Sequence, residues 1–181
     1  MPKFLITLSF AFNLIHAYEQ AYPKTPVGEI EVKTLPASKL IACHGQGDYF
    51  DRSDSLFRPL FRYIQENDIA MTTPVEAEIL PSVMYFYIGA DAAKRPLAET
   101  DTIDVVELPA RTVLSLGIRG GYSSENFAKG EALLRAWLAV HEGYRPVGPA
   151  RAIYWNGPFT PPPLKRSEIH LPIKRSNLPL P

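Results

Sequence analysis

The sequence predicts an α+β fold in which a distorted eight-stranded antiparallel barrel, built from two β-β-α-β-β repeats, is flanked by two helices. Three observations predict it. Residues 32–37 (V-K-T-L-P-A) resemble residues 105–110 (V-V-E-L-P-A), and Tyr49 recurs as Tyr122 at the same offset of 73 residues. Each copy contains segments of alternating polar and apolar residues, typical of half-buried strands, and one segment with helical spacing. Two separate half-sheets would leave exposed edges, so we expect the copies to pair into one barrel.

The first repeat is predicted over residues 28–90. Apolar and charged residues alternate over residues 29–33, and a second strand is expected over residues 39–44. Ser53 is the expected N-cap of the following helix. Pro59 lies inside that helix and should kink it or delay its regular start.

The helix of the first repeat ends before Pro74, which cannot continue a helix and favours an extended residue before it. Two strands are expected next, over residues 75–80 and 83–88, and the segment L-P-S at residues 80–82 should form the turn between them. The first repeat therefore closes with a hairpin.

The second repeat is predicted over residues 102–173. Ser123 or Ser124 should cap its helix, and Gly143 should stop it. Its closing strands are expected over residues 151–155 and 167–173. The residues expected to face inward from this helix are Phe127, Leu134, Trp137 and Leu138.

The two ends of the chain read differently from the domain at residues 28–173. Residues 1–17 combine Lys3 with a short apolar run and a small residue, as in a secretory signal peptide, so we expect export to the periplasm or the outside of the cell. Residues 18–27 read as a linker, and the proline-containing tail at residues 174–181 as disordered. Once the signal is removed, we expect no stable membrane anchor.

The composition argues against a nucleic-acid partner. The 181 residues include 19 Lys+Arg and 19 Asp+Glu, so the chain offers no net positive field to polyanions. The length suits one domain with its own core, which we expect to be monomeric. Cys43 is the single cysteine, so no internal disulfide can form, and its strand-like surroundings predict a small buried hydrophobe.

The sequence shows no catalytic constellation. Cys43 and His44 are strand neighbours, so their side chains point to opposite faces, and no G-x-S-x-G elbow is present. His44, His141 and His170 lack the spacing of a zinc site. We expect His141 to close a helix and His170 to face solvent, which leaves His44 as the candidate iron ligand. The chemistry points to a non-enzymatic protein.

An aromatic-rich surface remains as a candidate binding site for a large apolar ligand. The first helix carries apolar side chains on one face, a methionine follows it, and basic residues occur beside it and on the last loop. An apolar surface with a basic rim would suit a flat molecule that carries carboxylates, as a porphyrin does. The candidate ligand-binding residues are Leu56, Phe57, Leu60, Phe61, Arg62, Ile64, Met71, Lys165 and Arg166. Alternatively, the apolar stripe serves only to pack the helix on its sheet.

Two motifs resemble those of the SOUL/haem-binding protein family. The first is I-A-M-T-T-P-V at residues 69–75, and the second is Y-W-N-G-P-F at residues 154–159 followed by K-R-S-E-I at residues 165–169. The resemblance covers about residues 27–173. It implies an eight-stranded barrel made of two repeats, with haem or another tetrapyrrole held non-covalently in a hydrophobic pocket along the first helix.

The resemblance also assigns positions within this chain. It implies that Phe57 and Phe61 line the pocket and that Arg62, Lys165 and Arg166 lie near the propionates of the ligand. Some relatives are proposed to use a histidine near the end of the first strand as an axial ligand. Residues 33–35 read K-T-L here, so that ligand is missing.

We therefore expect a non-enzymatic haem or tetrapyrrole binder that acts as an exported carrier, buffer or scavenger. One alternative is an effector-binding domain for a lipophilic small molecule, similar to gyrase-inhibitor-like domains, because E-I-H-L-P-I at residues 168–173 resembles their closing strand. A buried Glu168 would suit a cationic ligand, whereas a solvent-facing Glu168 paired with Arg166 would be structural. A second alternative is a protein-interaction module.

Overall fold

Short strands and three α-helices alternate along the computed structural model, which describes residues 18–157 and 159–176. The predicted signal peptide and the end of the predicted tail lie outside these residues. The elements of the first half are β1 (Glu19–Gln20), β2 (Ile30–Leu35), β3 (Ser38–His44), α1 (Tyr49–Glu66), β4 (Thr72–Thr73), β5 (Val75–Glu78), β6 (Val83–Tyr87) and α2 (Ala90–Ala93). Those of the second half are β7 (Asp104–Leu108), β8 (Arg111–Arg119), α3 (Ser124–Ala139), β9 (Tyr144–Pro146), β10 (Arg151–Tyr154), a 3-10 turn (Pro162–Leu164) and β11 (Arg166–Arg175).

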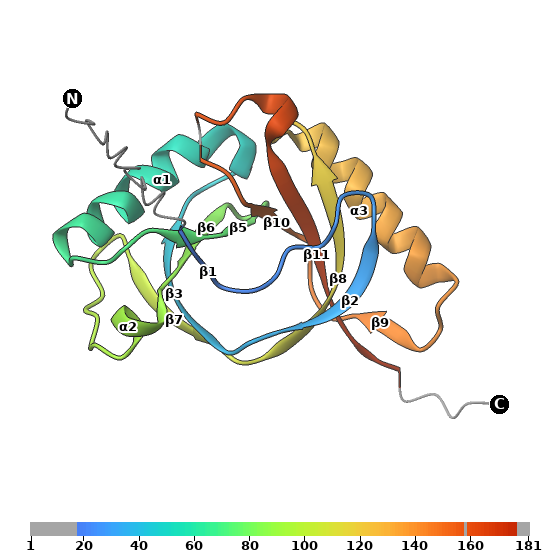
Figure 1. Ribbon diagram of the computed structural model, residues 1–181, viewed down its shortest axis with the longest axis horizontal. Helices are drawn as coiled ribbons and strands as arrows, with labels where there is room; N and C mark the ends of the chain where they lie inside the picture. The colour runs from blue at the N-terminus through green and yellow to red at the C-terminus, as the bar shows by residue number, and fades with distance from the viewer. Residues whose placement is uncertain (1–17, 158, 177–181) are drawn as a thin grey trace, which may run out of the picture.

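Eight strands pair in the order β2-β8-β11-β10-β5-β6-β3-β7, and β9 adds to the end of β11 (Figure 1). Exchanging the equivalent strands of the two repeats reproduces this order in reverse, as expected for a pseudo-two-fold axis between β5 and β10. The first strand of each repeat pairs with the other repeat: β2 with β8, and β7 with β3. The predicted α+β fold with eight antiparallel strands is confirmed. The curled sheet is a half-barrel and not a closed barrel, because β2 and β7, at its two edges, do not pair with each other.

The two long helices lie outside the curled sheet, one on each repeat (Figure 1). Leu56, Leu60 and Ile64 of α1 pack in one hydrophobic cluster with Ile41 of β3 and Phe86 of β6. In the second repeat, Leu134 of α3 packs with residues of β8 and β11. No helix in the described part of the chain is long and apolar enough to cross a membrane.

Local chemistry explains where the helices begin. The carboxylate of Asp48 accepts the backbone N–H of Phe50, so α1 begins at Tyr49 and not at the predicted cap, Ser53, which lies inside the helix. The helix runs on through Pro59. The hydroxyl of Ser123 accepts the N–H of Asn126, which confirms the predicted cap of α3.

Five predicted strands, at residues 39–44, 75–80, 83–88, 151–155 and 167–173, correspond to β3, β5, β6, β10 and β11 with small changes at their ends. The very short strands β1, β4 and β9 and the helix α2 were not predicted, since two to four residues carry no periodicity. The two repeats also differ in the segment that follows the long helix. Pro146 belongs to β9, and residues 147–150 separate it from β10, whereas β5 directly follows Pro74.

Candidate functional site

The segment predicted as a linker packs against the inner face of the half-barrel. We call residues 19–27 the N-terminal strap. It crosses the inside of the curled sheet before β2 begins (Figure 1). Tyr22 is 5 % exposed and Thr25 is 1 % exposed. The ring of Tyr22 lies 5.6 Å from that of Tyr87, 5.5 Å from that of Trp155 and 5.8 Å from that of His170. The strap therefore belongs to the packed domain.

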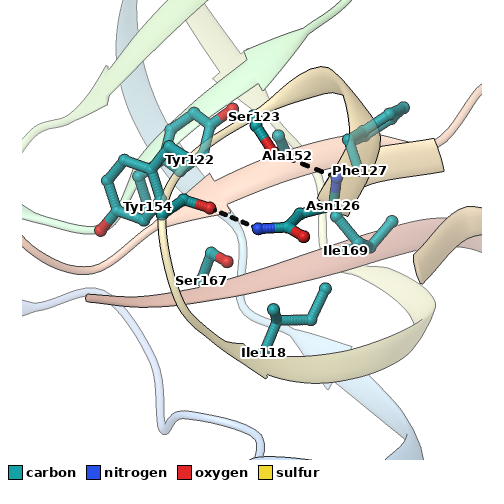
Figure 2. A pocket seen from close by; sticks show the side chains of 10 residues that line it. Ile118, Tyr122, Ser123, Asn126, Phe127, Ala152, Tyr154, Ser167 and Ile169 are labelled. Atoms are coloured by element: carbon teal, nitrogen blue, oxygen red, sulfur yellow. Dashed lines mark hydrogen bonds between the residues drawn. The ribbon is translucent and has the colours of Figure 1, made fainter. Parts of the chain in front are cut away.

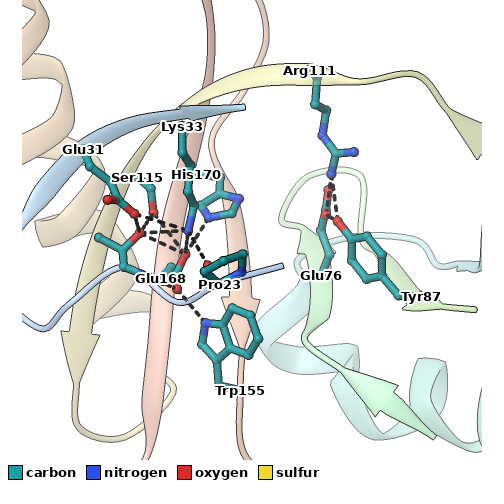
Figure 3. A network of polar contacts seen from close by, with 11 residues as sticks. Pro23, Glu31, Lys33, Glu76, Tyr87, Arg111, Ser115, Trp155, Glu168 and His170 are labelled. Atoms are coloured by element: carbon teal, nitrogen blue, oxygen red, sulfur yellow. Dashed lines mark hydrogen bonds and ion pairs between the residues drawn. The ribbon is translucent and has the colours of Figure 1, made fainter. Parts of the chain in front are cut away.

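Glu168 is the centre of a polar network beneath the strap (Figure 3). One carboxylate oxygen accepts the backbone N–H of Thr25 at 2.8 Å and the indole N–H of Trp155 at 2.8 Å. The other accepts the ammonium of Lys33 at 2.7 Å, as well as the Ser115 hydroxyl at 3.1 Å. Glu168 itself is 1 % exposed. A buried carboxylate with this many donors holds β11, β8, β2, the residue that follows β10 and the strap together.

The prediction that His170 faces solvent is wrong. This residue is 2 % exposed, and its Nε2 lies 2.7 Å from Glu168. Strand alternation correctly separates it from Ile169 and Leu171, which pack under α3. Alternation alone does not reveal that the strap covers the opposite face, and the strap is what buries His170.

Electrostatics keep Glu168 ionised. Burial alone would raise the pKa of Glu168, but the hydrogen bond from His170 and the ion pair with Lys33 lower this pKa to about 2. Burial lowers the pKa of His170. We therefore assign a neutral His170 that donates its Nε2–H to the carboxylate, with Lys33 as the counter-charge.

This pKa gives a prediction about acid unfolding. Because the folded-state pKa of Glu168 lies below its ordinary value of 4.5, its charge contributes stability above about pH 4.5, and this contribution is lost as the pH falls through about 2. We expect Glu168→Gln to be less stable than the wild type at pH 7, with the difference shrinking between pH 4.5 and 2. Urea unfolding of both proteins across this range measures it. A difference that does not change with pH would contradict the assignment.

A second buried carboxylate, Glu76 of β5, lies on the same inner face (Figure 3). Arg111 donates to one of its oxygens at 2.7 Å and Arg151 to the other at 2.6 Å, while the Tyr87 hydroxyl also donates to it. Burial opposes ionisation, but the two guanidinium groups lower the pKa of Glu76 below its ordinary value. This network was not predicted from the sequence, because Glu76 lies in an alternating strand, where a charged residue normally indicates a solvent-exposed face.

Most of the predicted ligand-binding residues lie on or just after α1, and they differ in how far they are exposed. Leu56, Leu60 and Ile64 are 2 %, 0 % and 4 % exposed, so a ligand reaches none of them without unpacking α1 from the sheet. Met71 is half-buried beside the same core. These four side chains serve the packing of the helix, which is the alternative that the sequence analysis left open.

Phe57 and Phe61 occupy the flank of α1. Their rings stack with centroids 5.6 Å apart and an interplanar angle of 16°. Phe57 rests on the ring of Phe86, whereas Phe61 is 39 % exposed. Phe50 lies seven residues before Phe57 and therefore on the same flank, and its ring lies 6.1 Å from Phe127 of α3. The N-terminal end of this flank therefore contacts α3. Arg62 is exposed next to Phe61.

Largely buried aromatic rings link the first turn of α1 to the base of the β10–β11 loop, residues 155–165. Tyr49 stacks on Tyr154, whose ring lies 4.3 Å from that of Tyr122. The Lys165 ammonium lies 4.8 Å from the centre of the Tyr122 ring. A series of ring contacts thus connects Lys165 to the first turn of α1. Arg166 begins β11 directly opposite Arg119 of β8.

Enclosed space beside these rings is small. A pocket between the start of α3 and strands β8, β10 and β11, lined by Tyr122, Phe127 and Tyr154, has a volume of about 10 Å³, enough for roughly one water (Figure 2). A larger pocket of about 400 Å³ lies between the C-terminal end of α1 and α2, lined by residues such as Asp68 and Arg95. None of the predicted ligand-binding residues lines either pocket.

His44 ends β3, and its Nε2 lies 3.0 Å from a carboxylate oxygen of Asp104. Its side chain is 57 % exposed. His141 follows α3 and contacts the Trp137 carbonyl, as expected for a residue that closes a helix. No group of three or more His, Cys, Asp or Glu side chains within residues 18–157 and 159–176 could hold a metal ion. The prediction of His44 as an iron ligand stays a prediction.

Comparison of the sequence with models of protein families identifies the family of this chain. A model of the SOUL heme-binding protein family matches residues 15–172. The chain belongs to the SOUL haem-binding protein family. The recognised motifs therefore identified the family correctly. Comparison with curated proteins gave no match.

Solved structures with the same fold share little sequence with this SOUL protein. The crystal structure of the EcmrR C-terminal domain matches with a TM-score of 0.66 at 16 % identity, covering 82 % of this chain and 98 % of that chain. EcmrR in a DNA complex matches equally well, but this chain spans only 58 % of its length. A protein from Listeria innocua described as a hydrolase gives a TM-score of 0.58 at 15 % identity, covering 83 % of this chain and 94 % of that chain. These likenesses concern the fold alone.

Proposed function

We propose that this SOUL protein binds haem or a related tetrapyrrole, without covalent attachment and without catalysis, on the Phe57–Phe61 flank of α1. The observation that carries the proposal is this stacked aromatic pair, in which Phe57 is half-buried and the ring of Phe61 is 39 % exposed. A flat apolar macrocycle gains contact area on such a surface, and the membership of the SOUL family supports it.

Basic residues beside this flank suit the carboxylates of a porphyrin. Arg58 and Arg62 are exposed, four residues apart, and each directly follows one of the two phenylalanines. Among the described residues, neither guanidinium forms an ion pair, so both can bind propionates. Lys165 lies over the Tyr122 ring, which contacts Tyr154 beside the first turn of α1. A bound haem would supply an iron centre, while Phe57, Phe61 and Arg62 would hold and orient the macrocycle.

Axial coordination is not needed for this mode of binding. The three histidines in the described residues contact Asp104, Trp137 and Glu168 respectively. A large apolar ligand can reach substantial affinity from surface contact alone, at about 0.3 kcal/mol per heavy atom. With the predicted signal peptide, the proposed role is an exported carrier, buffer or scavenger.

Titration with haemin, followed by Soret absorbance, tests the proposal. We expect saturable one-to-one binding that Phe61→Asp weakens by about tenfold or more, because a charge replaces apolar contact area. Leu133→Asp is the matched control: Leu133 is an exposed apolar residue of α3, at 55 %, and its loss should leave binding unchanged. Circular dichroism checks that both variants fold. Equal binding by all three proteins, or absorbance that rises without saturating, would refute this site.

An effector-binding role for the inner face is a second candidate. Its support is the burial of Glu168, which suits a cationic ligand, together with the fold shared with the EcmrR C-terminal domain. However, Lys33 and Thr25 of the chain itself already occupy this carboxylate. A cationic ligand would have to displace the strap, so we place this candidate second.

A further inference from the structure

The tip of the β10–β11 loop exposes several apolar side chains, and only Thr160 interrupts their run. The side chain of Phe159 is 98 % exposed and that of Leu164 is 58 % exposed. Between them, Pro161, Pro162 and Pro163 are also exposed. Isolated surface hydrophobes are ordinary, but consecutive exposed apolar residues are costly in water unless they contact another surface. Phe159 and Leu164 belong neither to the α1 flank nor to the networks around Glu168 and Glu76.

The base of the loop is held in place by hydrogen bonds. The Tyr122 hydroxyl contacts the backbone of Asn156 and the carbonyl of Arg166 at 3.0–3.2 Å. The Asn156 side chain accepts the Arg166 N–H at 2.6 Å, and the Trp155 N–H donates to the Arg166 carbonyl at 3.0 Å. The loop therefore presents its apolar tip from a fixed base, beyond the point where α3 begins (Figure 1).

Three cations surround this base. Arg166 lies directly opposite Arg119 in the β8–β11 pair, and Lys165 is next to it. Like charges in directly opposite strand positions repel each other. Within residues 18–157 and 159–176, none of the three forms an ion pair, and residues 155–166 contain no Asp or Glu. This collar of unpaired cations is suited to an anionic surface.

We propose that the loop docks this protein onto an anionic phospholipid bilayer, with Phe159 and Leu164 inserted at the interface and Arg119, Lys165 and Arg166 on the lipid headgroups. An apolar tip above a basic collar matches the two layers of a membrane surface, the acyl boundary and the charged headgroups. A soluble anion would be served by the cations alone and would leave the exposed tip unexplained. The proposal does not depend on haem binding, and it is tested on haem-free protein.

Vesicle cosedimentation is the first experiment. We expect the full chain to bind vesicles containing about one-third phosphatidylglycerol more tightly than pure phosphatidylcholine vesicles, with binding weakened by salt. Phe159→Asp should lower the affinity by about tenfold. Arg119→Glu should reduce binding to the anionic vesicles down to the level seen on phosphatidylcholine. Leu133→Asp, which also replaces an exposed apolar side chain by a carboxylate but does so on α3, should have no effect.

A tryptophan at the tip reports insertion directly. The fluorescence of Phe159→Trp should shift to the blue on anionic vesicles and be quenched by brominated acyl chains, above the background of Trp137 and Trp155. Absence of vesicle binding by the wild type, or equal binding by Phe159→Asp, would overturn the proposal. So would sedimentation velocity showing a dimer that Phe159→Asp dissociates without any vesicle binding, since the tip would then contact a second copy of the chain.

Discussion

Replacing Glu168 by alanine is expected to lower the free energy of unfolding by about 3–5 kcal/mol. The variant removes the acceptor of the Thr25 N–H, the Trp155 indole and the Lys33 ammonium. These donors are buried or nearly so, and water cannot replace the carboxylate without opening the strap. The cost is thus mainly that of leaving a cation and two N–H groups unpaired. Urea unfolding at pH 7 measures it.

A double substitution separates the charge effect from the loss of packing. Lys33→Leu with Glu168→Leu replaces the ion pair by apolar groups and leaves no uncompensated charge, so it should be more stable than Glu168→Ala alone. Comparison with the two single substitutions gives the coupling energy of the pair. A loss of under about 1 kcal/mol for Glu168→Ala would mean that the network contributes little to stability.

Gly117→Ala is expected to cost about 2–4 kcal/mol, by pushing the strap off the inner face. A Cβ at Gly117 would lie 2.2 Å from the Pro26 carbonyl oxygen and 2.6 Å from the Thr25 carbonyl oxygen. Both atoms belong to the strap backbone, which cannot rotate away as a flexible side chain can. If the strap moves, Tyr22 leaves its aromatic cluster and the Thr25–Glu168 hydrogen bond breaks.

Trypsin cleavage after Lys24 and the emission of Trp155 report strap release. Both should change in Gly117→Ala, since Lys24 lies over the Trp155 ring and Trp155 is 4 % exposed in the wild type. Gly143→Ala is the matched control, because a Cβ there meets no atom within 4 Å. If both glycine variants resist trypsin as the wild type does, the strap is not held by the close approach at Gly117.

The candidate site was only partly predictable from the sequence. Helical spacing correctly put Leu56, Leu60 and Ile64 on one face, but the same spacing describes a buried face and a ligand-binding face equally well. The structure assigns these three residues to the core and leaves Phe57 and Phe61 on the flank. Phe57 and Phe61 each lie only one residue after a buried leucine, and helical periodicity does not resolve a difference of one residue.

The sequence by itself determined the α+β class, the two repeats, their long helices and the SOUL family, because these depend on local periodicity, caps and motifs. Tertiary structure alone decided what lies inside the half-barrel. His170 and Glu76 occupy strand positions that alternation assigns to a wet face, and residues 19–27 read as a linker. The strap lies against that face and excludes water, so these polar side chains became a buried network. Burial of a strand face depends on what covers it, and here the covering strap lies about 50 residues from Glu76 in the sequence and more than 140 from His170.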